Sequence, residues 1–269
     1  YFYEDKPELP VIATGSLLEF PLSDHEFSMP VGRIQTLHLG PVTFEEMLLE
    51  TAPHLLDMLN NLELEKPLPE STHHQLTKYW LNYIYTGGMP EAMDAWLKRN
   101  DPQEVIAIQD EILGTYMDDF SKYAQFKDLA DLQRIFRNLP GSIAQKIKYT
   151  QLLPDGKSRH TQQLLDLLEK ARIFSSVWAT HASGLPLAAG INPKVRKSIF
   201  LDIGLVNRGL GIPLSKLEQM DDLALINKGD LAEQFIGQHL LTSQSSTYSP
   251  ELLYWCSEGS TQSSEIDFV

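Results

Sequence analysis

Apolar residues in the segment 73–139 recur every three or four positions, and this spacing constrains most of the segment to amphipathic helices. The sequence GGMP at 87–90 predicts the stop of the first helix, and Pro140-Gly141 predicts the stop of the last. Upstream, Thr43 and Glu46 have the T-x-x-E spacing of a capping box, which predicts a helix start. The chain is therefore predicted to be mostly helical.

Short apolar segments predict strands at both ends of this helical region. The segment 9–14 (LPVIAT) is predicted to be a buried strand, and the alternating segment 34–39 (IQTLHL) a second strand. Further strands are predicted at 173–178 and 198–203, and the segment 230–269 is typical of a helix followed by two strands. The predicted fold class is thus α/β and mostly helical.

Composition limits the kinds of protein that this chain can be. Its 269 residues are many for one domain and enough for two, each with a core of its own. One cysteine, Cys256, rules out an intrachain disulfide and fits the reducing cytoplasm, which is the predicted location. No apolar run approaches the roughly 18–20 residues that span a bilayer, so no membrane partner is expected. The chain starts at Tyr1 rather than methionine and stops inside a predicted strand, so we expect a piece truncated at both ends.

The net charge of −14 is distributed unevenly. The segment 134–172 carries eight basic and three acidic side chains in an otherwise acidic chain. The predicted order from residue 141 is helix, turn, helix and two strands, which is the order of a winged helix. Lys148, Lys157 and Arg159 fall on or near its helices and predict a contact with DNA. A solvated basic helix face explains the same charges.

Several segments, in the same order along the chain, resemble a group of bacterial and archaeal predicted ATPases. Members of this group join an AAA-like P-loop module to a C-terminal domain of uncharacterised function. The resemblance spans essentially the whole chain and is carried by YFYEDKPELPVIATGSLLEF (1–20), VGRIQTLHLGPVTFEEML (31–48), GGMPEAM (87–93), DFSKYA (119–124), FLDIGLV (200–206), LAEQFIGQHL (231–240) and LLYWCSEG with SEIDFV (252–269).

The resemblance implies a division of the chain into four parts. It implies the end of an AAA-like P-loop module at 1–60, a helical lid at 61–140, a winged-helix-like region at 141–226 and the start of a nuclease-like domain at 227–269. ATP and Mg²⁺ are the cofactors implied for the intact parent protein. The chain has no G-x-x-x-x-G-K-[ST] motif, so this piece is not expected to bind ATP well or to hydrolyse it.

A few nucleotide-site residues can be carried over from the family to this chain. Thr14 and Ser16 resemble the polar residues at a strand tip that sense the γ-phosphate, although an ordinary strand-to-loop turn explains them too. Arg33 matches a family arginine and suits phosphate charge, or else forms a structural ion pair. Gly88 and Pro90 resemble an element that packs on adenine, or else form an ordinary helix stop.

The C-terminal segment resembles a nuclease-like fold of the PD-(D/E)xK kind. The resemblance implies that Glu233 is the acid on the helix and Asp267 the acid on the strand of a divalent-metal site. The Glu-x-Lys strand of such sites would follow Val269, so the piece lacks a full site. Glu233 also fits a capping pattern with Asp230.

The function predicted first is a piece of an ATP-dependent switch, in which nucleotide repositions the lid and the winged-helix region. The alternative is a winged-helix module that binds DNA or another protein without ATPase activity. A metal-dependent nuclease is a third hypothesis. A protein client or a second copy of the chain is the other predicted partner.

Overall fold

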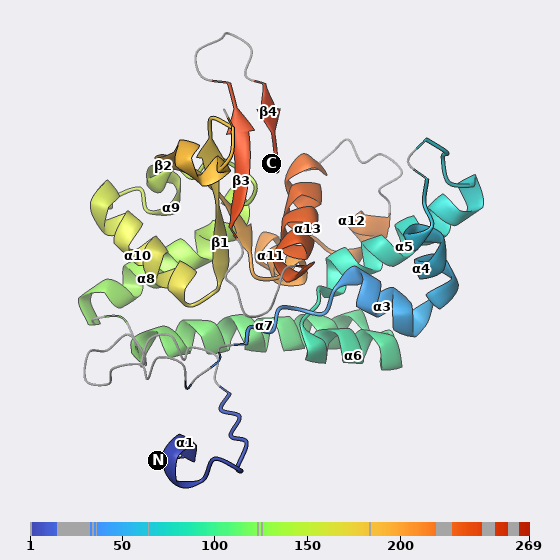
Figure 1. Cartoon of the computed structure of the whole chain (residues 1–269), viewed down its shortest axis with the longest axis horizontal. Coiled ribbons are helices and arrows are strands. Elements are labelled where there is room, and N and C mark those ends of the chain that lie inside the picture. The colour runs from blue at the N-terminus through green and yellow to red at the C-terminus, as the bar shows by residue number, and fades with distance from the viewer. Residues whose placement is uncertain are drawn as a thin grey trace.

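A computed structural model gives the structure of the chain (Figure 1). It describes residues 2–14, 33, 35, 37–63, 65–122, 124, 126–182, 184–218, 228–243, 251–257 and 264–269. The molecule is mixed α/β and mostly helical, as the sequence predicts, and its described residues form one small sheet. None of the helices in these ranges is long and apolar enough to cross a membrane.

The α-helices, in chain order, are α1 (Phe2–Asp5), α3 (Phe44–Thr51), α4 (Pro53–Asn60), α5 (Glu70–Thr86), α6 (Pro90–Arg99), α7 (Pro102–Asp119), α8 (Phe126–Asn138), α9 (Tyr149–Leu152), α10 (Ser158–Lys170), α11 (Ile203–Leu210), α12 (Leu214–Glu218) and α13 (Lys228–Ser243). Short 3₁₀ helices are η1 (Phe120–Lys122), η2 (Leu139–Ser142) and η3 (Leu187–Gly190).

The ends of the predicted helices follow from local chemistry. The Thr43 side chain accepts from the Glu46 amide while the Glu46 carboxylate accepts from the Thr43 amide, which confirms the capping box of α3. The first helix of the central region stops where Gly87 takes a φ of 70°, a value that favours glycine. After α8, the Pro140 region continues as η2 rather than as α-helix, as the predicted stop requires.

The sheet has the order β2-β1-β3-β4, built from β1 (Phe174–Thr180), β2 (Ile191–Phe200), β3 (Leu252–Cys256) and β4 (Glu265–Ile266). The β1–β2 and β3–β4 pairs are antiparallel, and the central β1–β3 pair is parallel. In Figure 1, α8, α9 and α10 lie on the left of the sheet and α13 on its right, with α10 in contact with β1 and α13 with β2 and β3.

Two cores hold these layers together. The larger core joins the helices α3 to α8 with α10, α11 and the ends of β1 and β2. The smaller core lies between the sheet and α13, and its buried residues are Val177, Ala179, Ile199, Leu252 and Tyr254. In Figure 1 α7 runs along the bottom of the molecule, where it packs against α6 and α11.

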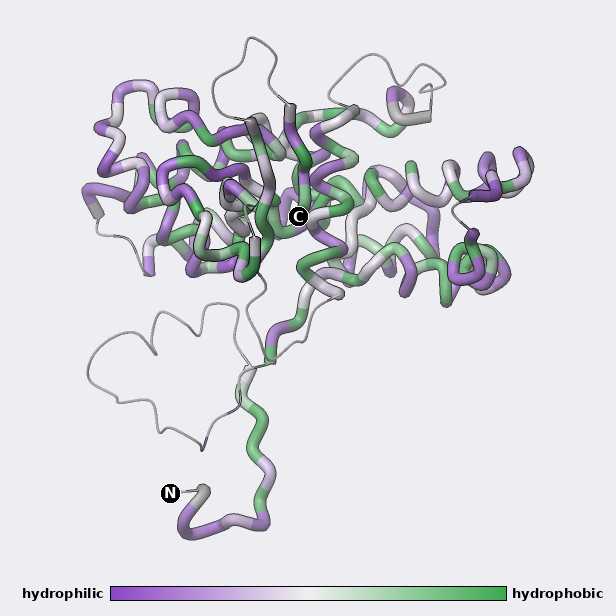
Figure 2. The backbone as a smooth tube through the Cα atoms, turned by 45° about the horizontal axis from the view of Figure 1, so that its top comes forward, coloured by the Kyte–Doolittle hydropathy of each residue, from purple (hydrophilic) through white to green (hydrophobic). Residues whose placement is uncertain are grey.

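The prediction of a buried strand at 9–14 is wrong. In this extended segment Leu9, Val11 and Ile12 are exposed by 48%, 53% and 89%, and among the described residues no strand pairs with it. Figure 2 shows the segment projecting from the body. An apolar run becomes a strand only when another strand takes up its backbone hydrogen bonds.

Other strand predictions need smaller corrections. In the predicted strand 34–39, residues 37–39 are not in a strand, and Leu37 and Leu39 are exposed; Ile34 and Thr36 lie outside the described residues. The strand predicted at 198–203 is β2, which ends at Phe200. Asp202 then caps α11, because its carboxylate accepts the amide of Leu205.

Candidate functional site

Asp202 is a fully buried carboxylate at the junction of α5, α11 and α13. It accepts the amide of Gly88 at 2.6 Å and the amide of Leu205 at 3.0 Å, and Gln238 donates to it at 3.5 Å. Burial raises the pKa of Asp202 to about 6, although these hydrogen bonds act to lower it. The junction therefore contains an acid that titrates well above its usual range.

Gly88 is packed between this acid and the segment before α3. Its carbonyl accepts the amide of Val42 at 2.8 Å, and the Val42 carbonyl accepts the hydroxyl of Tyr83 at 2.7 Å. A β-carbon at position 88 would lie 2.1 Å from the Val42 carbonyl oxygen. Of the two residues expected to contact adenine, Gly88 is thus buried with both backbone groups bonded, whereas Pro90 is exposed at the start of α6.

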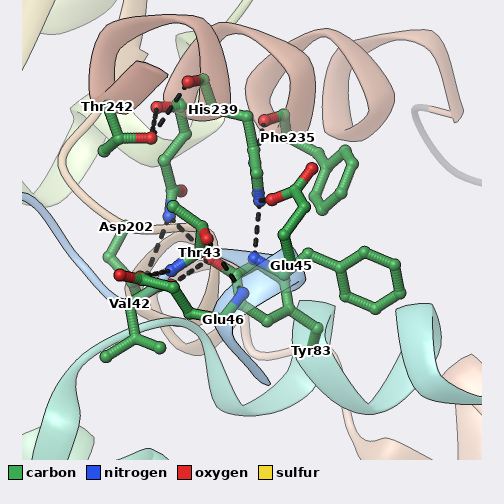
Figure 3. Close-up of polar contacts among 11 residues, drawn as sticks. Val42, Thr43, Glu45, Glu46, Tyr83, Asp202, Phe235, His239 and Thr242 are labelled. Atoms are coloured by element: carbon green, nitrogen blue, oxygen red, sulfur yellow. Dashed lines mark hydrogen bonds and ion pairs between the residues drawn. The ribbon is translucent and has the colours of Figure 1, made fainter. Parts of the chain in front are cut away.

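His239 joins the beginning of α3 to α13 beside the same junction (Figure 3). The Phe44 amide donates to His239 Nε2 at 2.8 Å, and Nδ1 lies 2.8 Å from the Phe235 carbonyl. Because an amide can only donate and a carbonyl can only accept, the proton of the neutral ring is on Nδ1. The carboxylate of Glu45 lies 3.6 Å from Nε2. The α3 helix is therefore capped by the Thr43 side chain and by an imidazole from α13.

The two predicted metal-site acids converge on one lysine that the sequence analysis did not single out. Lys197 Nζ on β2 lies 2.8 Å from Glu233 on α13 and 3.1 Å from Asp267, which follows β4, and it also contacts Glu265. The Lys197 side chain is 3% exposed and that of Glu233 is 8% exposed, while Asp267 is 57% exposed. Lys146 lies 3.8 Å from Glu265 at the rim.

Burial and charge act in opposite directions on this pair. Burial lowers the pKa of Lys197, but the hydrogen bonds to Glu233 and Glu265 outweigh it, so the net shift is upward and the ammonium stays charged. Burial raises the pKa of Glu233 to about 7, while Lys197 acts to lower it. Across the described part of the chain, no group of three or more His, Cys, Asp or Glu is placed to hold a metal ion. The carboxylates here are directed at an ammonium group instead.

The three predicted DNA-contacting cations lie at the starts of two neighbouring helices. Lys148 immediately precedes α9, Lys157 immediately precedes α10, and Arg159 is in the first turn of α10. All three are exposed, and none has an ion pair among the residues that the structure describes. By contrast, Arg134 is paired with Asp155 at 3.4 Å. Part of the basic segment is therefore neutralised, and these three cations remain available.

The structure describes two of the three residues that are predicted to contact phosphate, Thr14 and Arg33. Thr14 is exposed in the projecting segment 2–14 (Figure 2), and Ser16 lies outside the described residues. Arg33 forms an ion pair with Glu4 of α1 at 2.6 Å, with both side chains partly exposed. The described residues therefore do not bring Thr14 and Arg33 to Gly88.

The sequence analysis does not indicate several side chains of these clusters, among them Lys197, Asp202, His239 and Glu265. One signal could have revealed Asp202, because an Asp before the apolar run IGLV is a typical N-cap pattern. No comparable local pattern marks Lys197, since its partners lie more than thirty residues further along the chain.

Comparison with known proteins gives one match. A family model described as a domain of unknown function (DUF8612) matches residues 77–216, which run from α5 to α12 and include Gly88, Lys197 and Asp202. No curated protein and no solved structure matches the chain. Because the match covers just over half of its residues, this chain belongs to the DUF8612 family.

Proposed function

We propose that residues 126–200 form a winged-helix-like unit that binds duplex DNA through the starts of α9 and α10. The observation that carries the proposal is the set of three exposed cations at these helix starts, Lys148, Lys157 and Arg159, which have no acidic partner among the described residues. This unit is the middle of the chain, where the sequence predicts a winged helix, extended to include α8.

The order and pairing of the elements support the proposal. Helices α8, α9 and α10 contact one another, and the antiparallel pair β1–β2 follows as the wing. The segment between α8 and α9 also pairs with the wing, since the Ala144 amide donates to Ser198 and the Ile147 amide to Arg196, both at 2.9 Å. A strand segment between the first two helices that pairs with the wing is typical of winged helices.

The packing of α10 leaves its outer face open. Leu164, Leu165 and Leu168 are buried against the rest of the unit, whereas Arg159 and Gln163 are exposed. In helix-turn-helix proteins the first residues of the second helix approach the DNA. Lys157 and Arg159 occupy this position, and the partial positive charge of a helix start adds to theirs.

The distribution of charge also favours a polyanion at this place. Residues 126–200 carry twelve Lys and Arg against five Asp and Glu, while the rest of the chain carries ten against thirty-one. In Figure 1 the helices α8 to α10 lie at the opposite side of the molecule from α3 to α6. DNA would therefore be attracted to one side and repelled from the other.

Salt dependence of binding to a labelled duplex tests the proposal. We expect binding at about 50 mM NaCl that weakens steeply towards about 200 mM, because neutralised phosphates release counterions. Replacing Lys148, Lys157 and Arg159 together by alanine should reduce the slope of log K against log salt by about 0.9 for each phosphate that the variant no longer neutralises. The matched control replaces three exposed lysines of the region from α4 to α6, Lys66, Lys78 and Lys98. This variant should not weaken binding.

Two results would contradict the DNA proposal. One is no binding of the duplex at low salt by folded protein, which would leave a protein partner for the same surface. The other is binding that the control variant weakens as much as the test variant does.

Control by nucleotide stays a prediction from the resemblance, because no contact among the described residues favours it. The residues that the resemblance implies for nucleotide are Thr14, Ser16, Arg33, Gly88 and Pro90. Titration of the protein with Mg-ATP, followed by its melting temperature, tests whether this chain binds nucleotide at all.

A further inference from the structure

We propose that the ammonium group of Lys197 is a built-in cation that fills the Glu233–Glu265–Asp267 cluster and closes it to the divalent metal that the resemblance implies. The acids come from α13 and from the β4 end of the chain, and the lysine comes from β2. The cluster is therefore a lysine-filled site that links three elements.

The number of N–H donors on Lys197 matches the number of carboxyl groups around it. A lysine ammonium has three N–H donors and no acceptor. Here it meets three carboxylates, so each donor has one charged partner. The distances of 2.8 Å to Glu233 and 3.1 Å to Asp267 are typical of charge-assisted N–H···O hydrogen bonds. Oxygens that held a metal would converge on a point about 2.0–2.6 Å from each of them.

The position of Lys197 is fixed by burial. Successive residues of a strand point to opposite faces, so Arg196 is directed to Asp166 and Glu169 on α10 while Lys197 is directed to Glu233 on α13. The ammonium also lies 5.1 Å from the ring centroid of Tyr254 on β3, within the range of a cation–π contact. A side chain that is 3% exposed and held on all sides is not displaced without breaking these contacts.

Charge explains why a metal is excluded and why removal of the lysine would admit one. With all three acids ionised, the cluster and Lys197 carry a net charge of −2, and the positive charge of Lys146 near Glu265 offsets part of it. A divalent ion entering the cluster would be placed next to a buried ammonium and repelled by it. Without Lys197 the three acids would lose their counter-charge, and the more exposed Glu265 and Asp267 would have to move towards Glu233 to bind a divalent cation, which prefers oxygen ligands.

The experiment compares the melting temperature of wild-type protein and of Lys197→Ala in EDTA and in millimolar Mg²⁺, Ca²⁺ or Mn²⁺. We expect no metal-dependent change for the wild type and an increase of several degrees for Lys197→Ala, as expected when a ligand binds the native state alone. Adding Glu233→Gln to Lys197→Ala should abolish the increase. The control Lys148→Ala, an exposed lysine without an acidic partner among the described residues, should behave as the wild type does.

A measurement on the wild type does not depend on the folding of any variant. The ¹⁵N signal of a hydrogen-bonded, buried lysine ammonium should be protected from exchange at neutral pH and unchanged by millimolar Mg²⁺. Loss of this signal on metal addition, or stabilisation of the wild type by metal that Glu233→Gln abolishes, would overturn the proposal. Folded Lys197→Ala that gains nothing from any of the three metals would overturn it as well. Lys197→Ala that folds only when metal is added would support it.

Discussion

At residue 88 the backbone leaves no room for a side chain. We expect Gly88→Ala to destabilise the protein by about 1–3 kcal/mol, the usual cost of overpacking a buried site, because its β-carbon would meet the Val42 carbonyl at 2.1 Å. Urea unfolding measures the change. The control is Gly114→Ala in α7, where nothing lies within 4 Å of the added carbon, and a gain of up to about 1 kcal/mol is expected from helix propensity. Equal effects at the two positions would show that the close packing at Gly88 is not energetically important.

Asp202 gives the stability of the protein a dependence on pH. Its pKa in the folded chain is raised by burial from 3.8 to about 6, so between these values the unfolded chain loses the proton and the folded chain keeps it. The contribution of Asp202 to stability is therefore present below this window and declines as pH rises through it, by about 3 kcal/mol at most.

Asp202→Asn should remove this part of the pH dependence. Urea unfolding across the same window measures it as the difference in slope between variant and wild type. Asp57→Asn is the control, since Asp57 is exposed and its side chain has no ion pair among the described residues. An unchanged slope in Asp202→Asn would contradict the assignment.

The candidate site could be predicted from the sequence only in part, and the reason is the range of its contacts. Glu233 and Asp267 are expected to lie together because a family resemblance places both acids in one site, and they do converge. The lysine between them belongs to a strand far earlier in the chain, and nothing near Lys197 indicates that it is buried. A resemblance therefore supplies the acids but not the residue that determines what they bind.

At the scale of helices and strands, α3 depends on its N-terminal caps. We expect Thr43→Ala to cost about 1 kcal/mol, because the Glu46 amide loses its acceptor. Hydrogen exchange should become faster in α3 first, and urea unfolding gives the total change. Thr77→Ala in α5 is the matched control, since the Thr77 hydroxyl only bonds back to the His73 carbonyl, and its loss should be neutral. Uniform acceleration of exchange over the whole chain would contradict a local role.

Helices were easier to predict than strands for a physical reason. A helix satisfies its hydrogen bonds within a few residues, so Thr43, the GGMP turn and Pro140 already define where α3, α5 and α8 begin or end. A strand needs a partner that can lie anywhere in the chain. The apolar segment 9–14 has no such partner among the described residues, and β1 finds its own in β3.

At the scale of the whole molecule, the acidic part of the chain repels itself. Outside residues 126–200 the chain carries thirty-one acidic and ten basic side chains. We expect the melting temperature at neutral pH to rise when salt is increased from about 0.01 M to about 0.15 M, because the Debye length falls from about 30 Å to about 8 Å. Near the isoelectric point of about 4.9 the same change in salt should have little effect. A fall in melting temperature at neutral pH would show that surface ion pairs outweigh the repulsion.

The parallel pairing of β1 with β3 also determines when the sheet can form during protein synthesis. All of β2, α11, α12 and α13 are translated between these two central strands. A nascent chain that has just left the ribosome as far as α13 therefore has a β1–β2 hairpin whose β1 edge is unpaired, and Val177 and Ile199 lack the cover of Leu252 and Tyr254. Such an edge is a site for pairing with other chains. The edge closes once residues 252–256 have left the ribosome and paired with β1, so chaperone demand should be greatest just before that point.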